Sequence, residues 1–284
     1  MNPVPLAYMA CALIWGTTWY AIRVSREGFP LFDAVALRFA IAALILIPLA
    51  VRARPWPKGR AWSYLVLAGV LDAASYMLVY MGEDHVPGGV AAVLYGTQPL
   101  ILALLLAGTR MEPLTKKHVL GAIVSLAGVG VLALDRFDVS PDQALGVLLV
   151  LGSVVVSTIY SMIMKRHGEG VSSLVATTIF IGVTAIVLGT VAIVAREPVP
   201  WPVAVEPALA LLYLAILGSV VAFLVYFWLL GRTTLVLTST LVFVYPLVAL
   251  AVDAAFERAI TLGPRAYVGA AITLAGLGVS LRRG

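Results

Sequence analysis

The residues best suited to chemistry in this sequence form a polar stripe inside an apolar stretch. Asp72, Ser75, Tyr76, Tyr80 and Glu83 recur at intervals of three and four, which places them on one face of a helix. A carboxylate at such a position can accept a proton or hold an amine, and the phenols can supply hydrogen bonds. Because polar groups that face lipid are costly, we expect this face to point into a helix bundle or toward water.

Other apolar stretches carry aromatic and hydroxyl residues with the same spacing. Trp15, Thr18 and Trp19 share one face, Tyr95 and Gln98 lie one turn apart, and Tyr245 directly precedes a proline. Together they describe an aromatic, weakly polar cavity, which suits an amino acid with a bulky side chain. The expected substrate-binding residues are Trp15, Thr18, Asp72, Tyr76, Tyr80, Tyr95, Gln98, Ser157, Tyr160 and Tyr245.

These residues also have structural interpretations. Tyrosines at helical spacing often pack a core or form an interfacial belt, and Tyr80 lies near the outer boundary of its stretch. Asp72 lies near the middle, where a charge costs on the order of 2.5 to 3.5 kcal/mol, so a functional role competes with that of a protonated acid bonded to a neighbouring helix. Arg38 is the only basic residue that lies away from the ends of a predicted span. An ion pair with Asp253, a snorkelling role and carboxylate recognition all remain open for it.

Motifs for other chemistry are absent from the sequence. It contains no HExxH, GxSxG or P-loop motif and no paired intramembrane aspartates. His85, His118 and His167 lie at span ends or in loops, with no metal-binding spacing between them. We therefore expect no enzyme activity, no metal, no cofactor and no direct use of ATP.

The elements that position these residues are transmembrane helices. Hydrophobic residues make up 62% of the 284 positions and charged residues 12%, too little polar surface for a water-soluble globule. Helices of roughly 20 residues cross a bilayer. Ten apolar runs of suitable length predict an all-α membrane protein with ten transmembrane helices, near residues 5–22, 32–51, 61–81, 88–109, 117–134, 144–164, 172–194, 208–229, 235–255 and 264–281.

Basic residues set the expected orientation. With the N-terminus inside, twelve Lys and Arg residues fall in cytoplasmic loops and six in outer loops. The positive-inside rule then places both termini of this multi-pass membrane protein in the cytoplasm. The same loop distribution accounts for most of the net charge of +5 and gives no basic domain for nucleic acid. Cys11 is the only cysteine, so no intramolecular disulfide can form.

Residues 86–134 and 233–281 resemble one another, which indicates an internal repeat. Pro99 matches Pro246 at an offset of 147, and Gly121, Ser125 and Gly128 match Gly269, Thr273 and Gly276 at an offset of 148. Halves of five helices each, 1–143 and 144–284, have an odd number of crossings, so the repeat is inverted around a central cavity. We expect hinges at Pro99 and Pro246, and close helix contacts or a dimer face at the small residues.

Several short motifs resemble the EamA family of the drug/metabolite transporter superfamily. They are Trp15-Gly16, Arg38-Phe39, Pro99 followed by Glu112, Gly121-Ala122 and Ala127-Gly128-Val129. Within that family the chain resembles the bacterial YddG-type exporters of aromatic amino acids and other metabolites. The resemblance implies ten helices, transport of a small metabolite and a place in the bacterial inner (plasma) membrane.

The hypothesis from the sequence is a secondary transporter that exports amino acids, aromatic and other neutral ones, and related metabolites by alternating access. The alternatives are a cationic-drug/proton antiporter, a passive solute channel and a non-transporting scaffold. A sugar-phosphate antiporter is disfavoured, because only Arg38 would meet a phosphate. The expected partners are a small-molecule substrate, membrane lipid and, if transport is coupled, protons. The chain is expected to be a monomer or a homodimer and to bind no nucleic acid.

Overall fold

The computed structural model describes residues 2–86, 88–109, 111–133, 141–198, 201–256 and 264–281. Within these ranges every regular element is a helix. A few side chains inside helices, that of Asp253 among them, lie outside the described part, so the predicted Arg38–Asp253 ion pair does too. The elements are α1 (Val4–Arg26), α2 (Leu31–Ala50), α3 (Arg60–Glu83), α4 (Gly88–Tyr95), α5 (Gln98–Thr109), α6 (Lys116–Ala133), α7 (Pro141–His167), α8 (Ser173–Ala195), α9 (Val205–Tyr213), η1 (Leu214–Val221), α10 (Ala222–Leu230), α11 (Leu235–Ser239), η2 (Thr240–Phe243), α12 (Tyr245–Phe256) and α13 (Pro264–Leu281).

Six helical segments of the described chain are long and apolar enough to cross a membrane. They are Leu31–Ala50, Arg60–Glu83, Val90–Thr109, Gln143–His167, Ser173–Ala195 and Val205–Leu230. Leu235–Ala249 and Tyr267–Ser280 are apolar but shorter. The count of ten predicted from the sequence is therefore not reproduced by length and hydropathy alone. α1 illustrates the reason, since several Trp, Tyr and Thr side chains lower its hydropathy.

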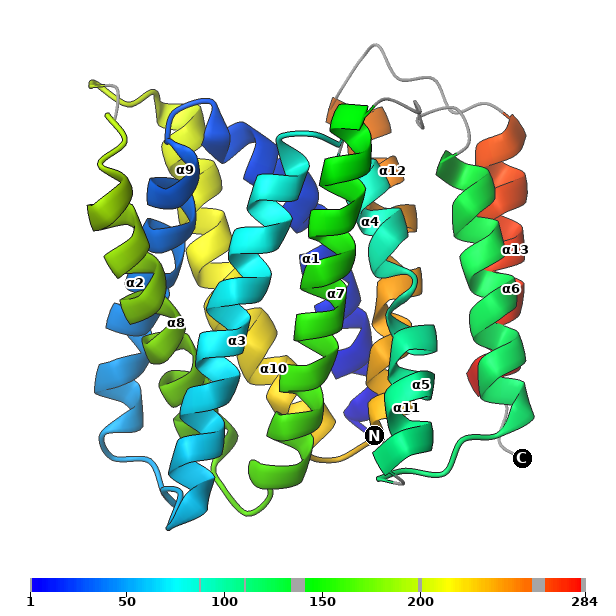
Figure 1. The fold of residues 1–284 in the computed structure, drawn as a ribbon, viewed down its shortest axis with the longest axis horizontal. Helices are drawn as coiled ribbons and strands as arrows, with labels where there is room; N and C mark the ends of the chain where they lie inside the picture. The colour runs from blue at the N-terminus through cyan, green and yellow to red at the C-terminus, as the bar shows by residue number, and fades with distance from the viewer. Residues whose placement is uncertain are drawn as a thin grey trace.

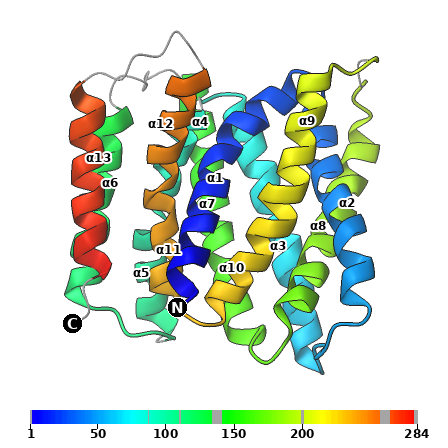
Figure 2. The same cartoon turned by 180° about the vertical axis from the view of Figure 1, so that it is seen from behind.

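The helices stand side by side in one bundle (Figures 1 and 2). α6 packs against α13 at one edge, while α2 packs against α8 and α9 at the other. α1, α3, α7 and α10 lie between these edges, with α3 against α7 and α1 against α9, α10 and α12. α1 begins and α13 ends at the same end of the bundle. We call this the near end and the opposite one the far end.

The matched small residues of the repeat lie between α6 and α13. A Cβ atom added to Gly276 would lie 2.4 Å from the Ser125 backbone nitrogen, and one added to Gly128 would lie 2.4 Å from that of Thr273. Ser125 Oγ donates a hydrogen bond to the Thr273 carbonyl at 3.0 Å. Both hydroxyl residues are fully buried. The stripe of small residues is thus used for close helix packing within the chain.

Helix breaks precede both proline positions expected to act as hinges. α4 ends at Tyr95 and α5 begins at Gln98, so the interruption falls just before Pro99. In the second half a 3₁₀ turn, η2, separates α11 from α12, and Pro246 is the second residue of α12. Proline lacks the N–H that would bond to the carbonyl four residues earlier, and its ring crowds that carbonyl. The positions of the two interruptions follow from this chemistry.

A candidate substrate cavity between the two halves

A cavity lies among α1, α2, α3, α7, α10 and the interrupted helices. The space open to the centre of a water molecule is about 90 Å³, whereas a single water needs roughly 10 to 15 Å³. It therefore has room for several waters. The lining residues are Trp15, Thr18, Trp19, Ile22, Arg38, Ser75, Tyr76, Val79, Tyr95, Gln98, Ser157, Tyr160, Ser161, Phe223, Tyr226, Thr238, Val242 and Tyr245.

The structure places eight of the ten predicted substrate-binding residues on this wall: Trp15, Thr18, Tyr76, Tyr95, Gln98, Ser157, Tyr160 and Tyr245. Asp72 and Tyr80 lie behind it. Asp72 is fully buried, and its Oδ2 accepts a hydrogen bond from the Thr184 hydroxyl of α8 at 2.9 Å. Tyr80 is fully buried and accepts a long hydrogen bond of 3.5 Å from Arg38 Nη1.

One side of the cavity is an aromatic cluster centred on Trp15. Its ring meets those of Phe223, Tyr226 and Tyr245 edge to face, with centroids 5.4, 5.1 and 6.1 Å away. Trp15 Nε1 donates a hydrogen bond of 3.2 Å to the Gly218 carbonyl of η1, which fixes the plane of the indole. Because the cluster joins α1 to elements of the second half, both halves form this wall. Its ring faces offer apolar area and attraction for a cation.

The facing side carries hydroxyl groups. Ser75 of α3 and Ser153 of α7 are joined through their hydroxyls at 2.9 Å, and the Tyr95 hydroxyl lies 2.6 Å from Ser153 Oγ. Gln98 Nε2 donates a long bond of 3.5 Å to Ser157 Oγ. Since these groups bond to one another, they hold α3, α4 and α7 together as well as lining the cavity.

Arg38 supplies the charge among the described lining residues. It lies on α2, is 1% exposed, and reaches across to η1 and α3. Its guanidinium donates to Ser219 Oγ at 2.9 Å and to the Gly218 carbonyl at 3.3 Å. It also donates to the Tyr76 hydroxyl at 3.2 Å, with its carbon 4.8 Å from the centroid of that ring. The π-helical turn η1 thus presents the groups that hold Arg38.

Some lining residues were not in the predicted set. Trp19 and Arg38 had drawn attention in the sequence, as a stripe residue and as a buried base. Ser161 lies one turn after Ser157, a predicted residue, so helical periodicity could have identified it. Phe223 and Thr238 carry no such signal in the sequence. Phe223 belongs to an all-apolar run, and Thr238 precedes a helix break. Among the described residues no group of three or more His, Cys, Asp or Glu is placed to hold a metal ion.

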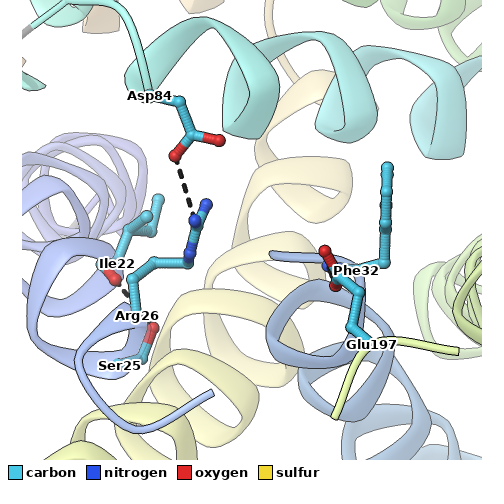
Figure 3. A network of polar contacts seen from close by, with 6 residues as sticks. All are labelled: Ile22, Ser25, Arg26, Phe32, Asp84 and Glu197. Atoms are coloured by element: carbon cyan, nitrogen blue, oxygen red, sulfur yellow. Dashed lines mark hydrogen bonds and ion pairs between the residues drawn. The ribbon is translucent and has the colours of Figure 1, made fainter. Parts of the chain in front are cut away.

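Polar contacts tie helices together at the far end. Arg26 of α1 and Asp84, directly after α3, form an ion pair of 3.0 Å (Figure 3). Ser25 Oγ donates to the Ile22 carbonyl at 2.8 Å. Glu197 accepts the Phe32 backbone N–H at 3.0 Å at the start of α2.

Polar contacts also join helices at the near end. Lys165 of α7 donates to the carbonyl of Leu230 at 2.8 Å and to that of Thr233. Glu112 accepts the backbone N–H of Leu235 at 2.9 Å at the start of α11. Charged side chains therefore join helices at both ends of the bundle, on either side of the cavity.

An all-helical bundle with bilayer-length apolar helices around an aromatic, hydroxyl-lined cavity has the architecture of a multi-pass membrane transport protein. Two stretches of the chain, residues 3–134 and 144–282, match the EamA-like transporter family. The chain therefore belongs to the EamA-like transporter family. It is a membrane transporter of the drug/metabolite type and not an enzyme.

Several proteins are similar to it over most of its length. Protein PecM of Dickeya dadantii is 28% identical, over 86% of this chain and 80% of the relative. The uncharacterized inner membrane transporter YedA of Escherichia coli K12 is 26% identical, over 86% and 79%. A probable terminal-alkyne amino-acid exporter of Streptantibioticus cattleyicolor is 28% identical, over 98% and 93%. A solved crystal structure at 23% identity superimposes with a TM-score of 0.80 over 99% of this chain and 97% of the other, and so shares the fold.

Proposed function

We propose that the protein is a secondary transporter that exports amino acids, aromatic and other neutral ones, and related small metabolites. The observation that carries the proposal is the cavity wall, which combines the rings around Trp15 with hydroxyls and one buried arginine. Among the described lining residues there is no Asp or Glu. This composition favours a solute with an apolar side chain and an acidic group over a cationic drug. The similarity to a probable amino-acid exporter supports the same class of substrate.

The mechanism we propose is alternating access by two inverted repeats of five crossings each, residues 1–143 and 144–284. The family matches twice along the chain, once in each of these halves. The helix contacts support the pairing: exchanging each element for its counterpart turns α1–α10 into α7–α3, α1–α12 into α7–α5, and α3–α8 into η1–α2. The α2–α8 and α6–α13 contacts map onto themselves. α1 and α7 run in opposite directions through the bundle, as inverted halves require (Figure 1).

In this proposal the protein lies in the bacterial inner membrane with both termini in the cytoplasm. The basic loops and the common end shared by the start of α1 and the end of α13 support this orientation. The similarity to an inner membrane transporter agrees with it.

Reconstituted transport tests the proposal. Purified protein in liposomes loaded with unlabelled phenylalanine is expected to take up labelled phenylalanine by counterflow, with a rate that saturates. Empty liposomes set the background, and Trp15→Ala protein is the matched variant, expected to transport less because the central ring of the wall is gone. Trp201→Ala is the control, since Trp201 is 88% exposed and not on the wall. Flux that neither saturates nor shows counterflow would point to a channel, and no flux with any neutral amino acid would refute export.

A further inference from the structure

Arg38 is a buried cation held by neutral groups. Its four hydrogen bonds to described residues go to the hydroxyls of Ser219, Tyr76 and Tyr80 and to the Gly218 carbonyl. None of these acceptors carries a negative charge at neutral pH. A guanidinium has five N–H donors, so the four bonds leave one unused. A buried charge is costly unless a counter-charge accompanies it. The buried carboxyl groups of Asp72 and Glu83 act on Arg38 only through space, since within the described part of the chain no carboxylate lies within ion-pair distance of it.

The fold brings this cation to the cavity wall. Gly218 makes the approach possible, because a Cβ atom there would lie 3.3 Å from Arg38 Nη2 and 3.0 Å from the Thr18 methyl group. Thr18, Tyr76 and Arg38 all line the cavity. The wall also holds a second unused donor, since the buried indole N–H of Trp19 has no hydrogen-bond partner among the described residues. The unused N–H of Arg38 and the indole N–H of Trp19 are both hydrogen-bond donors, so a ligand that supplies an acceptor would satisfy them.

We infer that Arg38 binds the carboxylate of the transported solute, with the aromatic cluster around Trp15 taking its side chain. A guanidinium matches a carboxylate through two parallel N–H bonds, which an ammonium cannot imitate. One cation suits a monoanionic carboxylate better than a dianionic phosphate. The inference rests on the proposed function and adds to it the group by which the substrate is recognised. It also predicts that amines without a carboxylate are poor substrates.

The test compares L-phenylalanine with phenylalaninamide, which differs by a neutral amide in place of the carboxylate. In wild-type protein in detergent, the amide is expected to bind at least roughly tenfold more weakly, as loss of a charged hydrogen-bond partner implies. In Arg38→Gln the dissociation constants of phenylalanine and phenylalaninamide are expected to converge, because only phenylalanine has a carboxylate that loses its charged partner. Arg38→Lys is expected to restore part of the difference. Arg232→Gln is the control, since Arg232 stacks on Trp228 with its carbon 4.2 Å from the ring centroid and is absent from the cavity wall.

Two results would overturn the inference while leaving amino-acid export intact. One is equal binding of the amide and phenylalanine by wild-type protein, a measurement that needs no variant to fold. The other is a folded Arg38→Gln protein that keeps the wild-type preference. If no neutral amino acid binds or exchanges in counterflow, the proposed function fails and the carboxylate site fails with it.

Discussion

At the scale of single residues, two opposite charges beside one cavity have different surroundings. Arg38 reaches the wall, whereas Asp72 faces α8 and is bonded to Thr184. The Asp72 Oδ1 atom is buried without a partner among the described residues. A carboxyl group in that position is poorly placed to touch an amine in the cavity. Its hydrogen bond to Thr184 is the kind expected of an acid bonded to a neighbouring helix, the structural interpretation, and of the two functional roles only that of a proton acceptor stays a proposal.

Asp72→Asn separates these roles. We expect the variant to bind phenylalanine as wild type does and to keep counterflow, because an amide oxygen can still accept the Thr184 hydrogen bond. We expect it to lose any acceleration of transport by a proton gradient. A side-chain amide, unlike a carboxyl group, does not take up and release a proton. Flux measured in liposomes with and without the gradient checks this. Thr184→Val is the matched control, and loss of phenylalanine binding in Asp72→Asn would assign Asp72 to the substrate instead.

The cavity residues show how much of this site the sequence could predict. Helical spacing was enough to place Tyr76, Tyr95 and Tyr160 on one wall, because a polar stripe in an apolar helix turns toward the bundle interior. Spacing could not separate Asp72 from Tyr76, which lies one turn away on the same face. The difference arises because α8 covers one flank of that face and leaves the other to the cavity, and helix packing of this kind is not encoded in one helix's periodicity.

At the scale of elements, the α6–α13 pair depends on glycine. The carbonyls and amides of the two helices approach so closely that side chains at Gly121, Gly128 and Gly276 would meet backbone atoms. Backbone atoms cannot swing aside as the end of a side chain can. The sequence predicted close helix contacts or a dimer face at these residues, because both segments carry small residues at intervals of three to four, but it did not indicate which helices would meet.

Gly276→Ala is therefore expected to destabilise the protein by about 1 to 3 kcal/mol, the usual cost of overpacking. Gly278→Ala, on the same helix, meets nothing within 4 Å and is the matched control. Alanine favours a helix over glycine by roughly 1 kcal/mol in peptides, so the control is expected to be neutral or slightly stabilising. Thermal unfolding in detergent measures both. Equal melting temperatures for the two variants would show that the helices separate more easily than their contacts suggest.

The interrupted helices are the elements that lie beside the cavity. Tyr95 and Gln98 flank the first break, Val242 lies within the second and Tyr245 follows it, and all four line the wall. The sequence predicted a kink at each proline. It did not predict the 3₁₀ turn η2 or the π-helix η1, because these depend on how neighbouring helices satisfy the displaced backbone groups.

Pro99→Ala and Pro246→Ala test whether the breaks act as hinges. Alanine restores an N–H that can bond to the carbonyl of Tyr95 or Val242 and so extends the helix. We expect slower turnover with an unchanged dissociation constant for phenylalanine, because binding residues stay while the helix stiffens. Pro48→Ala is the control, since Pro48 lies inside α2 and away from the cavity wall. A rise in the dissociation constant without a change in turnover would make the prolines positioning residues.

At the scale of the whole molecule, polar contacts join the two groups of helices on either side of the cavity. α1 packs mainly with α9, α10 and α12, whereas α7 packs with α3, α4 and α5. The Arg26–Asp84 ion pair links α1 to the end of α3 at the far end. Lys165 links α7 to the end of α10 at the near end. Asp84 and Leu230 stand 146 residues apart, the offset that also relates Tyr80 to Tyr226.

The Arg26–Asp84 ion pair at the far end and the Lys165 hydrogen bonds at the near end are expected to differ in strength. The Arg26 and Asp84 side chains are 26% and 46% exposed, and exposed ion pairs contribute only about 0 to 1 kcal/mol. Lys165 is part-buried and bonds to two carbonyls, and hydrogen bonds to charged groups contribute roughly 1.5 to 3 kcal/mol each. Arg26→Gln should therefore shift the conformational equilibrium slightly toward opening at the far end. Lys165→Gln should shift it strongly toward opening at the near end.

Accessibility of one cavity residue from each side measures this shift. In a Cys11→Ser background, Gln98→Cys is labelled with a membrane-impermeant maleimide in sealed vesicles of both orientations. We expect Lys165→Gln to raise labelling from the near end severalfold and Arg26→Gln to raise it from the far end by less, since a shift in population follows the free energy removed. Lys58→Gln, an exposed loop residue, is the control. If both variants raised labelling from the same side, the two contacts would not fasten opposite ends of one alternating cavity, and the inverted-repeat mechanism would lose its structural basis.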